Sequence, residues 1–317
     1  MSRWLVTGAS GFVGRSVCDA LIGRGEEVRQ ATRRPALSAT ASQVVVGEVG
    51  PTTEWGPALD GVDFVVHLAA RVHVLRDASP DPLGAFREVN VHGTRRLAQQ
   101  AAAAGVRRIV LTSTVKVLGE GTHGRPFSHD DPPAAQGSYA LSKWEAELAL
   151  REVGWASGVE IVIVRPPLVH GPNVGGNLRR LMRHILLGRP IPVGAIDNRR
   201  NIVGVANLAS LLIHVATAPA AAGQSLLVAD QPAVSTAALV SRLAQAMSLT
   251  PRIWSVPPWW LRGVGFLAGR SGEVERLIGS LEVDDGHTRS LLEWRPPLTL
   301  EAGLQQMAAE YVRTVGQ

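Results

Sequence analysis

Short apolar runs alternate with longer amphipathic stretches along the first half of the chain. The apolar runs have the length of buried strands and lie at residues 3–7, 27–31, 44–46, 62–68, 107–112 and 159–165. Stretches with helical periodicity lie near residues 13–24, 84–104 and 138–152. This alternation predicts an α/β fold, in which a doubly wound parallel sheet carries helices on both faces.

The pattern becomes less regular after Pro166 and Pro167, where loops rich in proline, glycine and asparagine are frequent. A helical stretch follows at 176–187, and short helices and loops are expected beyond residue 232. Helix and strand material at 202–217 and 225–229 is expected to rejoin the sheet. The predicted division is a first domain at 1–170, rejoined by about 202–230, and a smaller C-terminal lobe mainly at 171–317.

A glycine-rich turn joins the first strand to the first helix, in the segment Thr7-Gly8-Ala9-Ser10-Gly11-Phe12-Val13-Gly14. Glycines at this spacing let the backbone turn tightly and approach a pyrophosphate, which the N–H groups and dipole of the helix N-terminus attract. Because the motif lies between a strand and a helix, we predict that residues 1–170 form a dinucleotide-binding Rossmann domain. The expected contacts are Gly8, Ser10, Gly11, Phe12, Val13 and Gly14.

The residues at the end of the second strand indicate which dinucleotide binds. An NAD site typically places an acid there for the ribose 2′-hydroxyl, whereas an arginine accommodates the 2′-phosphate of NADP. Arg33 and Arg34 stand there without an acid, so NADP(H) is favoured and NAD(H) is the alternative. Two solvated arginines are the simpler explanation of the same residues. Glu48, after the third strand, either reaches the adenine edge or is an exposed loop acid.

Composition narrows the class of protein. The chain has 317 residues, of which 45% are hydrophobic and 19% charged, as in soluble globular proteins. The net charge of +5 comes from arginines spread along the chain, without the concentrated tract expected of nucleic-acid binding. The single cysteine, Cys18, excludes an internal disulfide, and no Cys or His spacing predicts a metal site. With neither a signal peptide nor a transmembrane run, a cytoplasmic enzyme is expected.

Tyr139 and Lys143 form a pair in a chain that has only two tyrosines and two lysines. Residues i and i+4 share one face of a helix, which would place the ammonium beside the phenol. A neighbouring cation favours the phenolate and lowers a tyrosine pKa that is normally about 10. The pair therefore predicts proton exchange by Tyr139 near neutral pH, and an ordinary surface pair is the alternative.

Further motifs follow one another in order over nearly the whole chain: His67-Leu68-Ala69-Ala70, Asn90-Val91-His92-Gly93-Thr94, Leu111-Thr112-Ser113-Thr114, Arg165-Pro166-Pro167-Leu168-Val169-His170-Gly171-Pro172 and Arg200-Asn201-Ile202-Val203-Gly204-Val205. With the glycine turn and the tyrosine–lysine pair, they resemble the extended short-chain dehydrogenase/reductases, the NAD-dependent epimerase/dehydratase family. Within that family the chain resembles the UDP-glucose 4-epimerase-like branch, which includes reductases of UDP-2-acetamido-2,6-dideoxy-4-hexulose.

The resemblance implies roles for individual residues. Tyr139 would exchange the proton, Lys143 would bind the nicotinamide ribose and lower the Tyr139 pKa, and Thr114 would hydrogen-bond the reacting sugar oxygen. Ser113 competes with Thr114 for that role, and Asn90 would brace the sheet near the site or contact the ligand. Further cofactor contacts are implied for Glu48, Val49, Leu68, Ala69, Ala70, Arg71 and Pro166. The substrate, in a C-terminal substrate-binding lobe, would contact Thr114, Lys116, Tyr139, Asn177, Leu178, Arg200 and Arg276.

The reaction implied is hydride transfer at C4 of a nucleotide-linked, in this branch UDP-linked, sugar. Dehydratase members carry Asp-Glu after the catalytic threonine, where this chain has Val115 and Lys116, so dehydration is not expected. A 4-ketoreductase in surface-polysaccharide synthesis is favoured, because the two arginines after the second strand suit NADPH. A UDP-hexose or UDP-N-acetylhexosamine 4-epimerase is the alternative. A non-catalytic NADP-binding sensor is an alternative from another class, against which the retained tyrosine–lysine pair argues.

Residues 257–269 form a conspicuously apolar segment that includes Trp259 and Trp260. Burial within the lobe, a cover over the sugar, a partner contact and peripheral contact with a membrane are its interpretations. The resemblance also implies a homodimer through the helices near 84–104 and 138–152.

Overall fold

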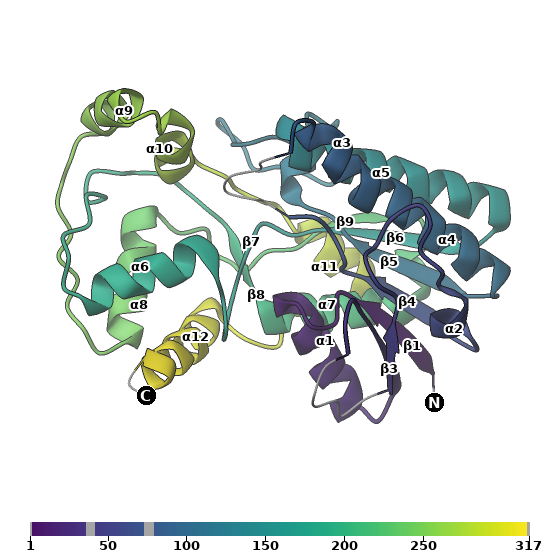
Figure 1. Cartoon of the computed structure of the whole chain (residues 1–317). Helices are drawn as coiled ribbons and strands as arrows, with labels where there is room; N and C mark the ends of the chain where they lie inside the picture. The colour runs from purple at the N-terminus through teal and green to yellow at the C-terminus, as the bar shows by residue number, and fades with distance from the viewer. Residues whose placement is uncertain (1, 36–41, 73–78, 316–317) are drawn as a thin grey trace.

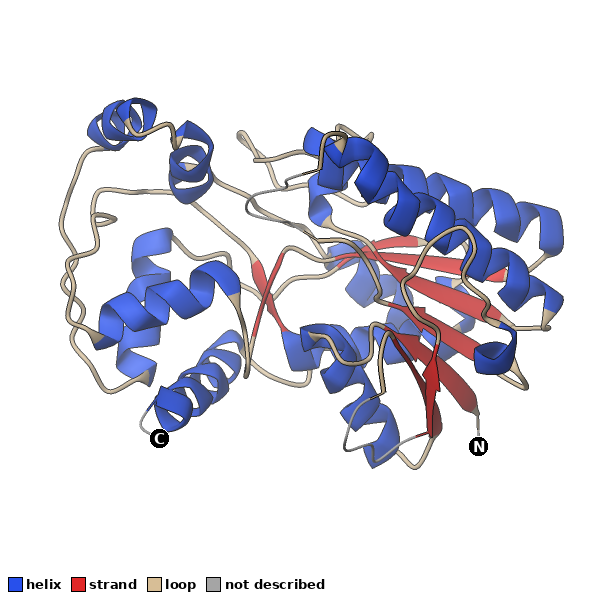
Figure 2. Cartoon of the chain, viewed as in Figure 1, coloured by secondary structure: helices blue, strands red, loops and turns tan. Residues whose placement is uncertain are grey.

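A seven-stranded parallel sheet forms the centre of the computed structural model, which describes residues 2–35, 42–72 and 79–315 (Figure 1, Figure 2). Its strands run in the order β3-β2-β1-β4-β5-β6-β9, and every neighbouring pair is parallel. This order confirms the predicted doubly wound sheet. The strand bounds are β1 (Arg3–Thr7), β2 (Glu27–Thr32), β3 (Ser42–Val45), β4 (Phe64–His67), β5 (Arg108–Thr112), β6 (Glu160–Arg165) and β9 (Ser225–Leu227).

Alternation of side chains along each strand builds a separate core on either face of the sheet. On β1, Trp4 and Val6 pack with helices α1 (Phe12–Gly23) and α7 (Val205–Thr217). Leu5, between them, belongs to the opposite core with α2 (Gly56–Leu59), α4 (Thr94–Ala103) and α5 (Gly137–Ser157). Both faces of the sheet are therefore covered, as the continuous apolar strand sequences predicted.

The helix predicted at 84–104 is divided in three. It consists of α3 (Pro82–Arg87), a π-helical turn (Glu88–Gly93) and α4. Gly93 lets this turn approach the loop after β3 closely, because a Cβ there would lie 2.7 Å from Cγ1 of Val49. The widened turn also faces Asn90 inward, where the side chain is 1% exposed. Sequence periodicity did not reveal the division, since all three parts continue one helical direction.

Residues 202–204 do not rejoin the main sheet, which corrects part of the prediction for 202–217. They form β8 (Ile202–Gly204), which pairs with β7 (Leu168–His170) in a separate two-stranded parallel sheet. The physical reason is the buried carboxylate of Asp230, which follows β9. It accepts hydrogen bonds from the Gly204 amide at 2.8 Å and the Asn207 side chain at 2.7 Å, and lies 3.2 Å from His170 Nε2. Residues 225–227, as β9, do rejoin the main sheet.

Five helices of the second half gather into a lobe with an apolar core of its own (Figure 1). They are α6 (Gly176–Leu186), α8 (Thr236–Ala246), α9 (Pro258–Leu267), α10 (Ser271–Ile278) and α12 (Leu300–Val315). We call this unit the C-terminal lobe. Because β7 begins three residues after β6 ends, the lobe lies beyond the carboxyl ends of the strands. The remaining elements are α11 (Gly286–Leu292), which packs near β9, and 3₁₀ turns at Val115–Val117 and Pro219–Ala221.

Candidate active site

The turn after β1 has the shape that a dinucleotide diphosphate needs. Gly8 has a φ of +64°, and a Cβ there would lie 2.9 Å from the Ala69 nitrogen. At Gly14 a Cβ would collide with the Gly8 carbonyl oxygen. Helix α1 begins beyond Gly11 with no side-chain cap and no acid in its first turn, and Ser10 and Gly11 are exposed. The glycines, the helix N-terminus and the absence of a competing carboxylate therefore fit the cofactor's diphosphate.

Thr7 ties this turn to the loop after β4. Its hydroxyl accepts hydrogen bonds from the Leu68 and Ala69 amides, both at 3.1 Å, and lies 2.7 Å from His67 Nδ1. Burial, with the charge of Lys143, lowers the pKa of His67 to about 3, so the imidazole is neutral. A neutral His67 links the ends of β1 and β4, the point at which the strand order reverses and ligands bind in such sheets.

Asn90 connects the loop after β4 to the start of α5. Its side-chain oxygen accepts from the Arg71 amide at 2.8 Å, and its nitrogen donates to the Arg71 carbonyl at 3.1 Å and to Ser142 Oγ at 3.0 Å. The Ser142 hydroxyl in turn donates to the Tyr139 carbonyl at 2.8 Å. Of the two roles predicted for Asn90, the structure supports the bracing one.

Tyr139 and Lys143 lie on the first two turns of α5. The Tyr139 ring is half-buried and meets Phe86 edge to face, with the ring centroids 6.1 Å apart. Burial raises the pKa of Tyr139 to about 12 and lowers the pKa of Lys143 to about 8. The expectation that Lys143 lowers the Tyr139 pKa is therefore wrong for the free protein. Removal from water opposes charge on both groups, and it is the main cause of both pKa shifts.

Ser113 and Thr114, the two hydroxyl residues that follow β5, have different hydrogen-bond partners. Thr114 Oγ1 accepts the Lys116 amide at 3.3 Å and opens the turn at Val115–Val117. Ser113 Oγ donates to Glu147 Oε1 at 2.5 Å, in the interior beneath α5. Since the Ser113 hydroxyl is committed to a buried carboxylate, Thr114 remains the better candidate for contact with the reacting oxygen.

Sequence reasoning missed the buried ion pair beneath this site. Glu147, with no exposed surface, receives two hydrogen bonds from Arg165, at 3.1 and 2.6 Å. Its negative charge also raises the pKa of Lys143 against the effect of burial. The available signal was the spacing of Glu147, one turn after Lys143, together with an arginine at the end of a buried strand.

Several residues that were predicted to contact substrate form ion pairs or hydrogen bonds with other residues of the protein. Lys116 Nζ lies 2.8 Å from Glu120, which sequence reasoning had not selected. Arg200 donates to the carbonyls of Arg276 and Gly279, at 2.8 and 2.7 Å. Burial lowers the pKa of Arg200, and the charge of Glu120 acts in the opposite direction. The negative charge of Glu120 therefore acts on both Lys116 and Arg200.

Other predicted residues are placed less favourably. Asn177 is exposed at the start of α6 and accepts a hydrogen bond from Arg180. The Leu178 side chain is 3% exposed in the core of the C-terminal lobe, which restricts any substrate contact to its backbone. Arg33 forms an exposed ion pair with Glu48 at 3.4 Å, so this glutamate faces the end of β2. Among the described residues no group of three or more His, Cys, Asp or Glu is placed to hold a metal.

The fold and the assembled site define an extended short-chain dehydrogenase/reductase. Residues 4–229 match the family model described as "NAD dependent epimerase/dehydratase family", and the chain belongs to this family.

Individual known proteins are similar to this chain over nearly its whole length. A "UDP-glucose 4-epimerase" of Vibrio cholerae is 39% identical over 312 residues, covering 98% of this chain and 95% of that protein. An "N-acetyl-alpha-D-glucosaminyl-diphospho-ditrans,octacis-undecaprenol 4-epimerase" of Escherichia coli O157:H7 is 30% identical over 250 residues, or 77% of this chain and 72% of that protein. The structure of UDP-glucuronic acid 4-epimerase from Bacillus cereus with NAD has a TM-score of 0.79 at 18% identity and covers 98% of this chain and 99% of its own. At that identity the structural likeness shows the fold.

Replacing Glu147 with glutamine is expected to move the pH dependence of turnover. The variant loses the charge that raises the Lys143 pKa, so this pKa falls below about 8. The ammonium is lost as pH rises through its pKa, so the alkaline limb of the kcat/KM profile moves to lower pH, by roughly one unit. The measurement is kcat/KM with a nucleotide sugar across the neutral and alkaline range.

Glu152→Gln is the matched control, since Glu152 lies on the same helix but is exposed and paired with Arg95. It should leave the limb in place. A uniform loss of activity in Glu147→Gln, with an unmoved limb, would mean that Glu147 serves folding alone.

Proposed function

We propose that the protein is a 4-epimerase of a UDP-linked sugar. The observation that carries this proposal is the similarity, at 39% identity over 98% of the chain, to a relative named UDP-glucose 4-epimerase. The site supplies matching groups, because Thr114 follows β5, and Tyr139 and Lys143 lie on the first two turns of α5. The proposed division of labour gives residues 1–170, with 202–230, to the cofactor and the C-terminal lobe, mainly residues 171–317, to the sugar nucleotide.

The proposed mechanism moves one proton and returns it. Bound nicotinamide dinucleotide supplies a reversible acceptor for the hydride of C4. Tyr139 takes the proton of the 4-hydroxyl as the carbonyl forms, and the Thr114 hydroxyl hydrogen-bonds this oxygen. After the sugar presents its other face, Tyr139 returns the proton as the C4–H bond is restored. With a pKa of about 12 in the free protein, Tyr139 is protonated at neutral pH, so it must first release its proton to solvent. The Lys143 ammonium then stabilises the phenolate that takes the proton of the 4-hydroxyl.

A 4-ketoreductase using NADPH is the second candidate. It is favoured by Arg33 and Arg34, which follow β2 where an NAD site typically has an acid. Arg33 pairs with Glu48, but both side chains are largely exposed, at 69% and 79%. An exposed pair of this kind is worth little, so a 2′-phosphate can replace the carboxylate. The preference for NADP(H) over NAD(H) is part of this second proposal.

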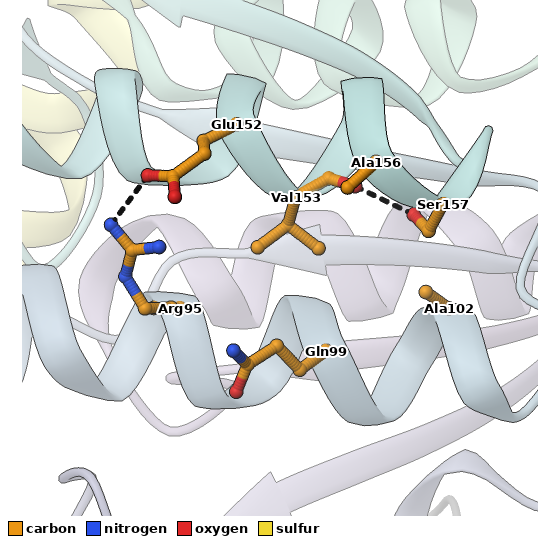
Figure 3. Close-up of a pocket in the computed structure, with 7 residues that line it drawn as sticks. All are labelled: Arg95, Gln99, Ala102, Glu152, Val153, Ala156 and Ser157. Carbon is orange, nitrogen blue, oxygen red and sulfur yellow. Dashed lines mark hydrogen bonds and ion pairs between the residues drawn. The ribbon is translucent and has the colours of Figure 1, made fainter.

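We also propose that the protein forms a homodimer through α4 and α5. A shallow groove between these helices is crossed by the Arg95–Glu152 ion pair and is lined by Gln99, Ala102, Val153, Ala156 and Ser157 (Figure 3). On α5, Trp155 is 94% exposed and Leu148 is 46% exposed. Two large apolar side chains seven residues apart lie on one helix face, a pattern suited to helix packing against a second copy.

Three assays separate the candidate functions and the possible sugar carriers. An epimerase is expected to convert UDP-galactose to UDP-glucose without added cofactor and to release NAD⁺ when denatured. A reductase would instead consume NADPH in proportion to a UDP-2-acetamido-2,6-dideoxy-4-hexulose substrate. Conversion of the sugar on a diphosphate-linked polyprenol, but not on UDP, would show that the carrier resembles that named for the E. coli relative. Protein that is inactive in all three assays would contradict the proposal.

Tyr139→Phe should lower kcat about 10²- to 10⁴-fold, because it removes the phenolic proton and keeps the ring. Binding of the dinucleotide, followed by quenching of tryptophan fluorescence, should remain within a few-fold of the original. The control is Tyr311→Phe, which changes the chain's other tyrosine in the core of the C-terminal lobe. Substantial activity in Tyr139→Phe would overturn the mechanism.

Trp155→Arg is expected to convert the proposed dimer to a monomer, because two guanidinium groups would meet near the interface. Sedimentation velocity at micromolar concentration measures this change. Val312→Arg, at a 42% exposed position of α12, should leave the dimer intact. A monomeric starting protein, or a Trp155→Arg variant that still dimerises, argues against this interface.

A further inference from the structure

Helix α9 turns its apolar side chains toward solvent. Trp259 is 70% exposed, Phe266 is 76% exposed and Leu267 is 86% exposed. Trp260 and Val264 lie on the same side and are also exposed. At 100° per residue these positions cover one continuous face, on which no charged residue stands. The distribution is the reverse of that on an ordinary surface helix and argues against burial within the lobe, the first of the four interpretations of 257–269.

The inner face of α9 is fixed against the lobe, so the outer face cannot simply turn inward. Leu261 is 8% exposed and belongs to the core of the C-terminal lobe. Gly265 allows α10 to approach, since a Cβ there would lie 2.5 Å from Cγ2 of Val274. Helices α9 and α10 form the end of the lobe that is remote from α12 (Figure 1). The contacts of Leu261 and Gly265 on the inner side therefore leave the apolar face on the outside of the lobe.

The stretch of chain that contains α9 has more arginines than acids. The stretch 250–278 contains the exposed arginines Arg252, Arg262, Arg270 and Arg276, against two acids, Glu273 and Glu275. Helix α9 itself contains no acid, and Arg262 on its border pairs with Glu275 at 2.8 Å. Arginines at the edge of an apolar face can contact lipid phosphates while tryptophan and phenylalanine enter the headgroup region.

We propose that α9 docks the protein on membrane surfaces that contain anionic phospholipid. Trp259, Trp260, Phe266 and Leu267 enter the boundary between headgroups and acyl chains, and the neighbouring arginines contact phosphates. No helix in the described part of the chain is long and apolar enough to cross a membrane, which is consistent with surface attachment.

A second copy of the chain fits the same face poorly. A symmetric pair would bring the arginines of both copies together, which favours separation. A helix of ten residues also presents much less than the roughly 800 Å² per partner that a stable interface buries. Charge and size therefore favour a lipid surface over self-association at α9.

Co-sedimentation with vesicles tests the proposal on the full chain. Vesicles of phosphatidylcholine and phosphatidylglycerol in equal amounts should bind the protein, and vesicles of phosphatidylcholine alone should bind it at least about tenfold more weakly. The triple variant Trp259→Ser, Phe266→Ser, Leu267→Ser should lose at least about tenfold in binding to the anionic vesicles. The double variant Val312→Ser, Val315→Ser removes exposed apolar side chains from α12, in the same lobe, and should bind normally.

Failure of the unsubstituted protein to bind anionic vesicles would overturn the proposal, as would normal binding by the triple variant. A change of oligomeric state in the triple variant, without vesicles, would show that a second copy covers the face. Circular dichroism checks the fold of each variant. Higher ionic strength provides a test without substitution, because it should weaken binding of the unsubstituted protein.

Discussion

Burial of the Lys143 ammonium is the constraint on which the candidate active site depends. An ion removed from water is stable only beside an opposite charge, and Glu147, one turn further along α5, provides it. Glu147 is itself buried and requires the two hydrogen bonds from Arg165, at the end of β6, and the one from Ser113, after β5. Accommodating this buried charge therefore fixes α5 onto β5 and β6, which are followed by Thr114 and Pro166. Glu147 thus both positions α5 and influences the pKa of Lys143.

A second buried carboxylate joins the sheet to the C-terminal lobe. Asp230 follows β9 and binds Gly204 and Asn207 while facing His170. Helix α12 packs directly on this group, because a Cβ at Gly303 would lie 2.8 Å from the His170 ring. Polar contacts among buried groups thus set the position of β7 and β8, and α12 of the lobe packs on the His170 ring of this cluster.

Periodicity and turn chemistry were sufficient to predict the sheet, because buried parallel strands are continuous apolar runs and the glycine turn has a steric cause. Periodicity and turn chemistry did not predict the features that depend on contacts between residues far apart in the sequence. The placement of residues 202–204 depends on Asp230, distant in sequence, and the burial of Leu178 depends on how α6 meets α8 and α12. The direction of the Tyr139 pKa shift depends on desolvation, which spacing along a helix does not reveal. The exposed face of α9 was recognised as apolar, but its outward orientation depends on α10.

Helix α9 packs on α10, which carries Arg276 and lies against Arg200, two of the residues predicted to contact the substrate. It packs on α10 at Gly265, and the carbonyls of Arg276 and Gly279, at the end of α10, hold the guanidinium of Arg200. Arg200 senses the charge of Glu120, which pairs with Lys116 near Thr114. Packing, hydrogen bonds and one electrostatic interaction, between Arg200 and Glu120, therefore connect α9 to the turn after β5. A surface that binds α9 would therefore bring the C-terminal lobe, with the predicted substrate contact Arg200 behind α10, close to the headgroups.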